Sequence, residues 1–131
     1  MSKRKVNWKK KAWVEFSRYI RLRDCLETVG THDHGKCITC GETFEFKKLQ
    51  CGHAIPGRGN SILLDDTLTA AQCVRCNIWL NGQHGVFALR IIDKYGRKYY
   101  EQALIRAKQP KPMKPFEWEA EYHKWKEKTD R

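Results

Sequence analysis

Two pairs of cysteines are the residues of this sequence whose spacing best predicts a chemical role. Cys37 and Cys40 make up the first pair, CITC, and Cys73 and Cys76 make up the second, CVRC. Two residues between paired cysteines allow both thiolates to reach the same metal ion, and four thiolates fill the tetrahedral shell of zinc. Because such a shell leaves no open position, the pattern predicts a structural zinc ion rather than a catalytic one.

Disulfide bonds or unbound thiols are the alternative use of these cysteines. The N-terminal stretch MSKRKVNWKKKAW is basic but lacks the apolar segment of a signal peptide, and no run of residues is apolar enough to span a membrane. We therefore expect a cytoplasmic protein with no membrane association, where Cys-x-x-Cys pairs are typical of metal sites. Cys25 and Cys51 are predicted to be small buried side chains. His32 and His34 are predicted to lie in a polar loop, with a metal-binding pair as the alternative.

The charge of the chain points to a class of partner. The sequence has 26 Lys and Arg against 15 Asp and Glu, which gives a net charge of +11. A surface this basic favours a polyanion, and nucleic acid is the commonest one. The alternative is that the positive charge only keeps the protein in solution and binds no specific partner.

A histidine lies between the two cysteine pairs, in the stretch CGHAIPGRGN of residues 51–60. His53 is predicted to end a strand, and Asn77, directly after Cys76, is predicted to begin a helix. If zinc fastens the strand end to the helix start, the two side chains converge on one small volume. An imidazole that takes a proton from water, beside a divalent ion that an amide oxygen helps to bind, is what phosphodiester hydrolysis requires.

The elements that would position these residues form a single domain over residues 1–131. Residues 1–24 are predicted to form a basic N-terminal helix, on the apolar spacing of Trp13, Phe16 and Ile20. Residues 36–84 are predicted to form the zinc-containing core. Further helices are predicted over residues 85–131, with a proline-rich break at residues 109–115.

Within the core, the periodicity predicts an α+β arrangement of ββα type. ETFEF and KLQCGHAI read as two short strands joined by a basic turn at Lys47 and Lys48, and CVRCNIWLNG reads as a helix. SILLDDTLTAAQ is predicted to be a loop or a short apolar segment. Trp118, Tyr122 and Trp125 are spaced as the packing face of a C-terminal helix.

Several motifs of the chain resemble known proteins. GHAIP followed by QCVRCN inside a Cys-x-x-Cys frame resembles the zinc-stabilised HNH, or ββα-metal, endonucleases. The ordered series KAWVEFSRYIRLRD, CITCG, FKKLQCGHAIPGRGN, QCVRCNIWLNG and DKYG is similar to the NinG (Rap) recombination family of phage lambda, from about Lys11 to Gly96.

This resemblance implies a phage-encoded nuclease that cuts branched DNA, including Holliday junctions and flaps, in the host cytoplasm. It implies that His53 is the general base and that Asn77 binds a catalytic Mg²⁺ or Mn²⁺ ion. It also implies that the four cysteines hold structural Zn²⁺.

Two positions depart from the HNH pattern. Many HNH enzymes have an acidic metal ligand just before the base, where this chain has Gly52, and an asparagine five residues before the third cysteine, where it has Leu68. The sequence therefore leaves open which residue completes the coordination shell of the ion. The candidates are Gln50, Asn60, Asp65 and Asp66.

Basic residues around the core are candidates for contacts with phosphates, although charge runs alone are more often solvated surface. None of them forms a pattern that reads bases, so recognition of DNA shape is favoured over recognition of sequence. The candidate DNA-binding residues are Arg21, Arg23, Lys47, Lys48, Arg58 and Arg75.

Taken together, these features predict a structure-specific DNA endonuclease that hydrolyses phosphodiester bonds with a divalent ion. The alternative, kept open by Gly52 and Leu68, is a non-catalytic zinc-knuckle DNA-binding protein in phage recombination. DNA is the expected partner, and a homodimer is a reasonable expectation for an enzyme that cuts two strands of a junction.

Overall fold

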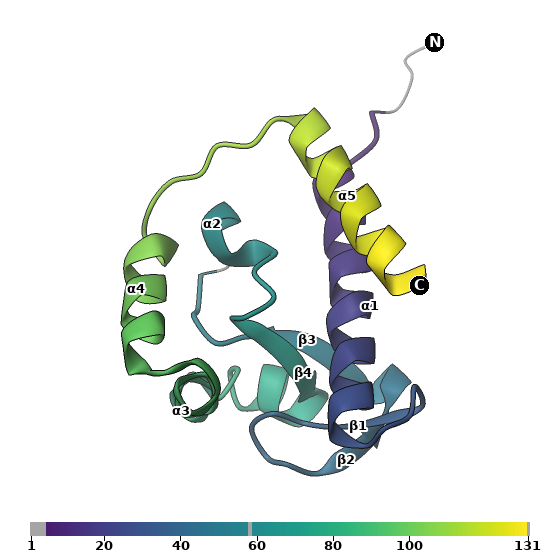
Figure 1. Cartoon of the computed structure of the whole chain (residues 1–131), viewed down its shortest axis with the longest axis vertical. Helices are drawn as coiled ribbons and strands as arrows, with labels where there is room; N and C mark the ends of the chain where they lie inside the picture. Colours follow the sequence, from purple (N-terminus) through teal and green to yellow (C-terminus); the bar gives the residue numbers. More distant parts are fainter. Residues whose placement is uncertain (1–4, 58, 131) are drawn as a thin grey trace.

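The computed structural model describes residues 5–57 and 59–130. Figure 1 shows two small sheets at the base of the molecule, a pair of long helices along one side and shorter helices along the other. None of the helices in the described ranges is long and apolar enough to cross a membrane.

Helix α1 (Trp8–Thr28) is the longest element and ends four residues beyond the predicted boundary. The Asn7 side chain accepts a hydrogen bond from the backbone N–H of Lys10 and so caps its N-terminus. Ala12, Phe16 and Ile20 are completely buried, as their helical spacing predicts. The helix therefore covers the core with one face and exposes a basic face.

The two sheets are antiparallel hairpins with different partners from those predicted. β1 (His34–Lys36) pairs with β2 (Thr43–Glu45). A 3₁₀ turn, η1 (Phe46–Lys48), separates β2 from the next strand. β3 (Leu49–His53) then pairs with β4 (Thr69–Cys73).

The strand β4 is a correction to the expected fold, because it lies in the segment predicted to be a loop. Its five residues are all buried, so the segment lacks the polar–apolar alternation that identifies a half-exposed strand. The predicted strand ETFEF is shorter than expected and belongs to the first hairpin. The hairpin that carries His53 is therefore β3–β4.

The segment that contains the second Cys-x-x-Cys pair also differs from prediction. Instead of an α-helix, the chain makes one π-helical turn, η2 (Arg75–Trp79). Asn81, Gly82 and Gln83 follow it with positive φ angles of 55°, 89° and 48°. These left-handed residues turn the chain sharply into the next helix.

The remaining helices surround the β3–β4 hairpin. α2 (Asn60–Leu63) is a single turn in the connection between β3 and β4, and α3 (His84–Tyr95) and α4 (Arg97–Ala107) form a helical pair with Gly96 between them. The apolar core between them and the hairpin includes Phe87 and Ile91 of α3, Leu68 and Ala103. Leu68, at the position of the HNH asparagine, is thus part of this core, completely buried.

The helix α5 (Pro115–Asp130) packs beside α1, and both run in the same direction (Figure 1). Trp125 makes an edge-to-face contact with Phe16, with ring centroids 4.8 Å apart. Trp118 packs against Ala12, while Tyr122 lies 5.6 Å from Trp8. The three aromatic residues predicted as a packing face do pack on α1.

Arg23 and Asp24 connect α1 to strand β4. The buried Asp24 carboxylate accepts a hydrogen bond from the backbone N–H of Ala71 at 2.7 Å. The Arg23 guanidinium donates to the backbone carbonyls of Asp66 and Thr69 and pairs with Asp24. Arg23 was predicted to bind DNA, but its donors are used inside the fold, and we assign it a structural role.

Candidate functional site

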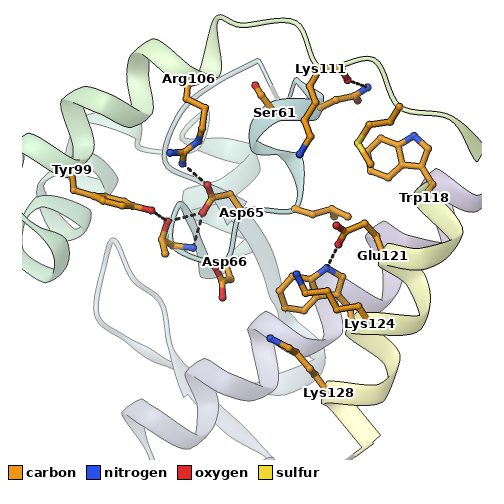
Figure 2. Close-up of a pocket in the computed structure, with 15 residues that line it drawn as sticks. Ser61, Asp65, Asp66, Tyr99, Arg106, Lys111, Trp118, Glu121, Lys124 and Lys128 are labelled. Carbon is orange, nitrogen blue, oxygen red and sulfur yellow. Dashed lines mark hydrogen bonds and ion pairs between the residues drawn. The ribbon is translucent and has the colours of Figure 1, made fainter. Parts of the chain in front are cut away.

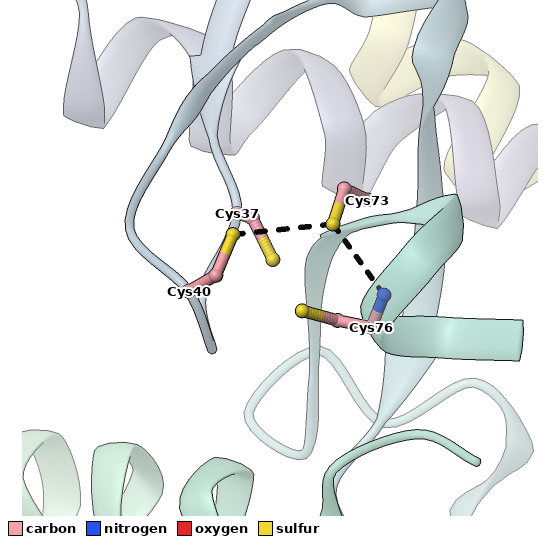
Figure 3. Close-up of side chains that lie close together, drawn as sticks. All are labelled: Cys37, Cys40, Cys73 and Cys76. Carbon is pink, nitrogen blue, oxygen red and sulfur yellow. Dashed lines mark hydrogen bonds between the residues drawn. The ribbon is translucent and has the colours of Figure 1, made fainter. Parts of the chain in front are cut away.

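The four cysteines of the two Cys-x-x-Cys pairs lie together at one end of the β3–β4 hairpin, as predicted (Figure 3). Their sulfur atoms are all within 4.8 Å of one another. Within the described ranges, this is the one group of three or more Cys, His, Asp or Glu side chains that could hold a metal ion. Cys73 is the last residue of β4, and η2 begins two residues later. An ion bound by the four sulfurs would therefore connect the hairpin to the first Cys-x-x-Cys turn and to η2.

The surroundings of the thiols shift the pKa values of Cys37 and Cys73 in opposite directions. Burial raises the pKa of the Cys37 thiol, but hydrogen bonds from the Cys40 N–H, the Thr39 hydroxyl and the Cys73 N–H outweigh it and lower the pKa to about 6. Burial and the nearby Cys76 and Cys37 sulfurs raise the pKa of Cys73 to about 12. A divalent cation at the centre of the four sulfurs would stabilise the thiolate form of its ligands. The cluster is consistent with structural zinc.

A buried amide side chain is hydrogen-bonded to the turn of the first Cys-x-x-Cys pair. Gln72 is completely buried, and its Nε2 donates to the Thr39 hydroxyl at 3.2 Å and to the Gly82 carbonyl at 2.8 Å. The Thr39 hydroxyl in turn lies 3.3 Å from the Cys37 sulfur. Gln72 therefore ties the first knuckle to the loop that follows η2.

His53 is the last residue of β3, as predicted, and its ring is held on two sides. Its Nε2 lies 3.1 Å from the backbone carbonyl of Leu63, and the indole of Trp13 stacks on it at 5.2 Å between centroids. Since a carbonyl oxygen can only accept, Nε2 donates the proton of this hydrogen bond. The residue is only 6% exposed.

Asn77 lies next to Gln50 in a polar groove between α1 and β3. Its Nδ2 donates to the Gln50 Oε1 at 2.8 Å. The groove has a volume of about 360 Å³. It is lined by Trp13, Ser17, Arg21, Leu49, Gln50, Cys51 and Asn77.

His53 and Asn77 lie toward opposite ends of β3. His53 pairs with Thr69, whereas Asn77 contacts Gln50, one residue from the end of β3 that pairs with Cys73. Trp13 joins the two regions, because its indole both lines the groove and stacks on His53. His53 itself does not line the groove, so the two side chains do not share the one small volume that the sequence predicted.

Gly52, in the place of the HNH acidic ligand, is explained by the partner strand. A Cβ at this position would lie well inside the contact distance of the Gln72 Oε1, 3.0 Å from the Gln72 Cδ and 3.1 Å from the Phe87 ring. Gln72 is hydrogen-bonded and completely buried, so it cannot move aside easily. The amide of Gln72 therefore occupies the space that a side chain at Gly52 would need.

The substitution Gly52→Ala should lower the free energy of unfolding by about 2 kcal/mol because it overpacks this contact. Gly85→Ala is the matched control, since a Cβ at Gly85 has no atom within 4 Å and alanine favours the helix. Thermal and urea unfolding of both variants measure the effect. Equal stability of Gly52→Ala and the wild-type protein would contradict the packing account.

Two of the other candidate ion ligands are engaged elsewhere. The Asp65 carboxylate pairs with Arg106 and accepts hydrogen bonds from Thr67. Asn60 accepts from Lys9 and donates to the Lys111 carbonyl. Figure 2 shows Asp65 and Asp66 at a different cavity, of about 520 Å³, between the β3–β4 connection, α4 and α5.

Gln50 is thus the candidate ligand that lies beside Asn77. The groove supplies two amide oxygens and no carboxylate, and it includes the positive charge of Arg21. Mg²⁺ prefers carboxylate and phosphate oxygens and retains several waters. These residues fit a divalent ion only if oxygen atoms of a bound phosphate contribute to its shell.

Four of the six residues predicted to bind DNA lie at or beside the end of the hairpin where Leu49 pairs with Cys73. Arg21 lines the groove, stacks over the Phe46 ring at 4.6 Å and donates to the Ser17 carbonyl. Lys47, Lys48 and Arg75 are exposed. Arg58 lies outside the described residues.

Three residues of the site were not predicted: Trp13, Leu63 and Gln72. Trp13 was expected only as part of an apolar stripe, and its spacing gives no sign of a contact with His53. The carbonyl of Leu63 is a backbone group, which no side-chain motif reveals. The contact of Gln72 with Gly52 follows from the register of β3 and β4. In that register Gln72 pairs with Gln50, which lies two residues before Gly52 in the same strand.

Comparisons with known proteins bear on this arrangement. A family model described as Bacteriophage Lambda NinG protein matches residues 1–130. Searches of curated proteins and of solved structures gave no match. The family suggests a role in phage recombination. With a match over nearly its whole length, the chain belongs to the bacteriophage lambda NinG family.

Proposed function

We propose that the protein is a DNA endonuclease of HNH type that cuts branched recombination intermediates such as Holliday junctions and flaps. The observation that carries the proposal is the hydrogen bond between His53 Nε2 and the Leu63 carbonyl. It holds the ring in one orientation together with the stacked indole of Trp13, which also lines the polar groove. A base that a backbone acceptor and a stacked ring keep in one tautomer and orientation is suited to proton transfer.

In the proposed reaction, the imidazole of His53 accepts a proton from the water that attacks the phosphorus, and the bond from the phosphorus to the leaving oxygen of the DNA backbone breaks. Arg21 and the exposed Lys47, Lys48 and Arg75 hold the negatively charged backbone. The low exposure of His53 keeps bulk water away from the ring. General base catalysis of this kind contributes about 10²–10⁴-fold to a rate.

A Mg²⁺ or Mn²⁺ ion is part of the proposal, and the Gln50 and Asn77 oxygens are the groups that would hold it together with the DNA phosphate. When bound, such an ion stabilises charge on the phosphate and on the leaving oxygen. Asn77 and Gln50 orient each other through their hydrogen bond. We expect little binding of Mg²⁺ to the protein without DNA, because the groove includes no carboxylate.

Replacing Asn77 by alanine should lower the incision rate about 10–100-fold and raise the Mg²⁺ concentration needed for half-maximal rate. Asn60→Ala is the matched control, because this amide lies at the other cavity. Initial rates measured over a Mg²⁺ titration test this prediction. An unchanged Mg²⁺ dependence in Asn77→Ala would remove Asn77 from the proposed ion site.

The experiment for the proposed function compares incision of a four-way junction, a flap and a linear duplex. Each labelled DNA is incubated with the purified protein and Mg²⁺, Mn²⁺ or excess chelator. We expect incision of the two branched substrates with either ion, little incision of the duplex and none with chelator. Equal incision of all three substrates would contradict the preference for branched DNA.

A further inference from the structure

An apolar patch is exposed directly after Asn77. Trp79 is 76% exposed, which makes it the most exposed large hydrophobic side chain in the described part of the chain. Ile78 is 53% exposed, and Leu80 and Val74 are 39% and 36% exposed. By contrast, Trp118 and Trp125 are 6% and 2% exposed. The patch is formed by the turn η2 itself and its two flanking residues.

The backbone that presents Trp79 is unusual and tightly held. η2 is a π-helical turn, a rare form that is frequent at functional sites. The non-glycine residues Asn81 and Gln83 adopt left-handed φ angles just after it. The Leu80 and Gly82 N–H groups donate to the carbonyls of Arg75 and Cys76, so the turn is tied to a cysteine of the metal cluster. Trp79 is therefore displayed from a rigid support.

Positive charges lie around this patch. Since Leu49 pairs with Cys73, the residues before β3 and after β4 lie at the same end of the hairpin. Lys47 and Lys48 directly precede β3 and Arg75 follows β4, and all three are exposed, with Lys47 3.5 Å from the Glu45 carboxylate. Asn77 lines the groove that includes Arg21. An aromatic ring among cations is suited to nucleic acid, because the ring stacks on a base while the cations bind the adjoining phosphates.

We propose that Trp79 stacks on an unpaired base at the branch point of DNA and so selects branched over linear substrates. In a duplex the bases are stacked on each other, whereas a junction or flap offers an exposed base face. This inference rests on the proposed function for its biological purpose alone. Stacking on a base can be measured as DNA binding, without incision.

A second copy of this chain is a less suitable occupant of the patch. A two-fold interface would bring the Lys47, Lys48 and Arg75 side chains of two copies together, and like charges oppose such contacts. The few exposed apolar residues also fall short of a stable dimer interface, which buries about 800 Å² per partner. DNA neutralises the same charges.

The test uses the fluorescent base 2-aminopurine, placed unpaired at the branch of a flap or paired within a linear duplex. Binding is measured without added divalent ion in the His53→Ala background. Trp79→Ala should weaken binding to the flap about 5- to 100-fold, leave duplex binding within about twofold and abolish quenching of the branch base. Trp79→Phe should retain most of the quenching. Phe116→Ala, which removes an aromatic side chain 66% exposed on α5, is the matched control and should change neither binding nor quenching.

Zinc content and sedimentation of each variant complete the test. Unchanged flap affinity and quenching in Trp79→Ala, or equal weakening of flap and duplex, would overturn the proposal. A dimer that becomes a monomer in Trp79→Ala, with quenching retained, would also overturn it and assign the patch to self-association. Incision by His53→Ala would contradict the proposed base but would leave the binding result unaffected.

Discussion

Replacing Cys40 by serine should remove the bound zinc and abolish the cooperative unfolding transition of the protein. Cys40 is the exposed member of the cluster, so the substitution changes little packing and its effect reports on the metal. Structural zinc contributes about 10–16 kcal/mol of apparent binding free energy in small zinc domains, a large share of what folds a chain of this size. Metal analysis and thermal unfolding by circular dichroism measure the two effects.

Cys25→Ala is the matched control for this prediction. Cys25 is completely buried but lies in a different apolar cluster, with Leu49 and Ala71, so its replacement should cost packing energy and retain one zinc per chain. One full equivalent of zinc in the Cys40→Ser protein would contradict the four-cysteine site.

Replacing His53 by alanine should lower the rate of incision of branched DNA about 10²–10⁴-fold, because it removes the proposed general base. Binding of the same DNA should change little, since the cations around the hairpin remain. The measurement is single-turnover incision with the protein in excess over DNA. Unfolding is followed in parallel, because the substitution also removes the stacking on Trp13 and the bond to Leu63.

His84→Ala provides the comparison for His53→Ala. His84 also bonds a backbone carbonyl, with Nδ1 3.1 Å from the oxygen of Ala54, so its loss has a similar structural consequence. His84 begins α3 and takes no part in the proposed reaction. The His84 variant should therefore incise at a rate close to that of the wild-type protein, and equal losses in both variants would indicate a structural role for His53.

The metal cluster and the two long helices α1 and α5 follow from local rules and could be predicted. Two residues between cysteines bring both sulfurs to one ion, whatever surrounds them. The completely buried Ala12, Phe16 and Ile20 follow from helical spacing, and Trp118 and Trp125 do so on α5. His53 likewise lies at the end of its strand, as predicted.

The strand pairing and several site contacts could not be predicted, because they depend on residues far apart in the chain. β4 is buried on both faces, so Thr69–Cys73 carries no alternation to identify it as a strand. Arg23 looked like part of a basic surface, yet its guanidinium reaches the carbonyls of Asp66 and Thr69. The absence of an acid at Gly52 has its explanation in Gln72, on the neighbouring strand.

The most direct test of the proposed function follows one DNA molecule from binding to product. A labelled four-way junction is saturated with zinc-loaded protein, Mg²⁺ is added, and both the complex and the DNA ends are analysed. We predict nicks near the branch that appear within the bound complex. Full binding with DNA that stays intact after addition of Mg²⁺ or Mn²⁺ would contradict the nuclease and favour a zinc-knuckle protein that only binds DNA.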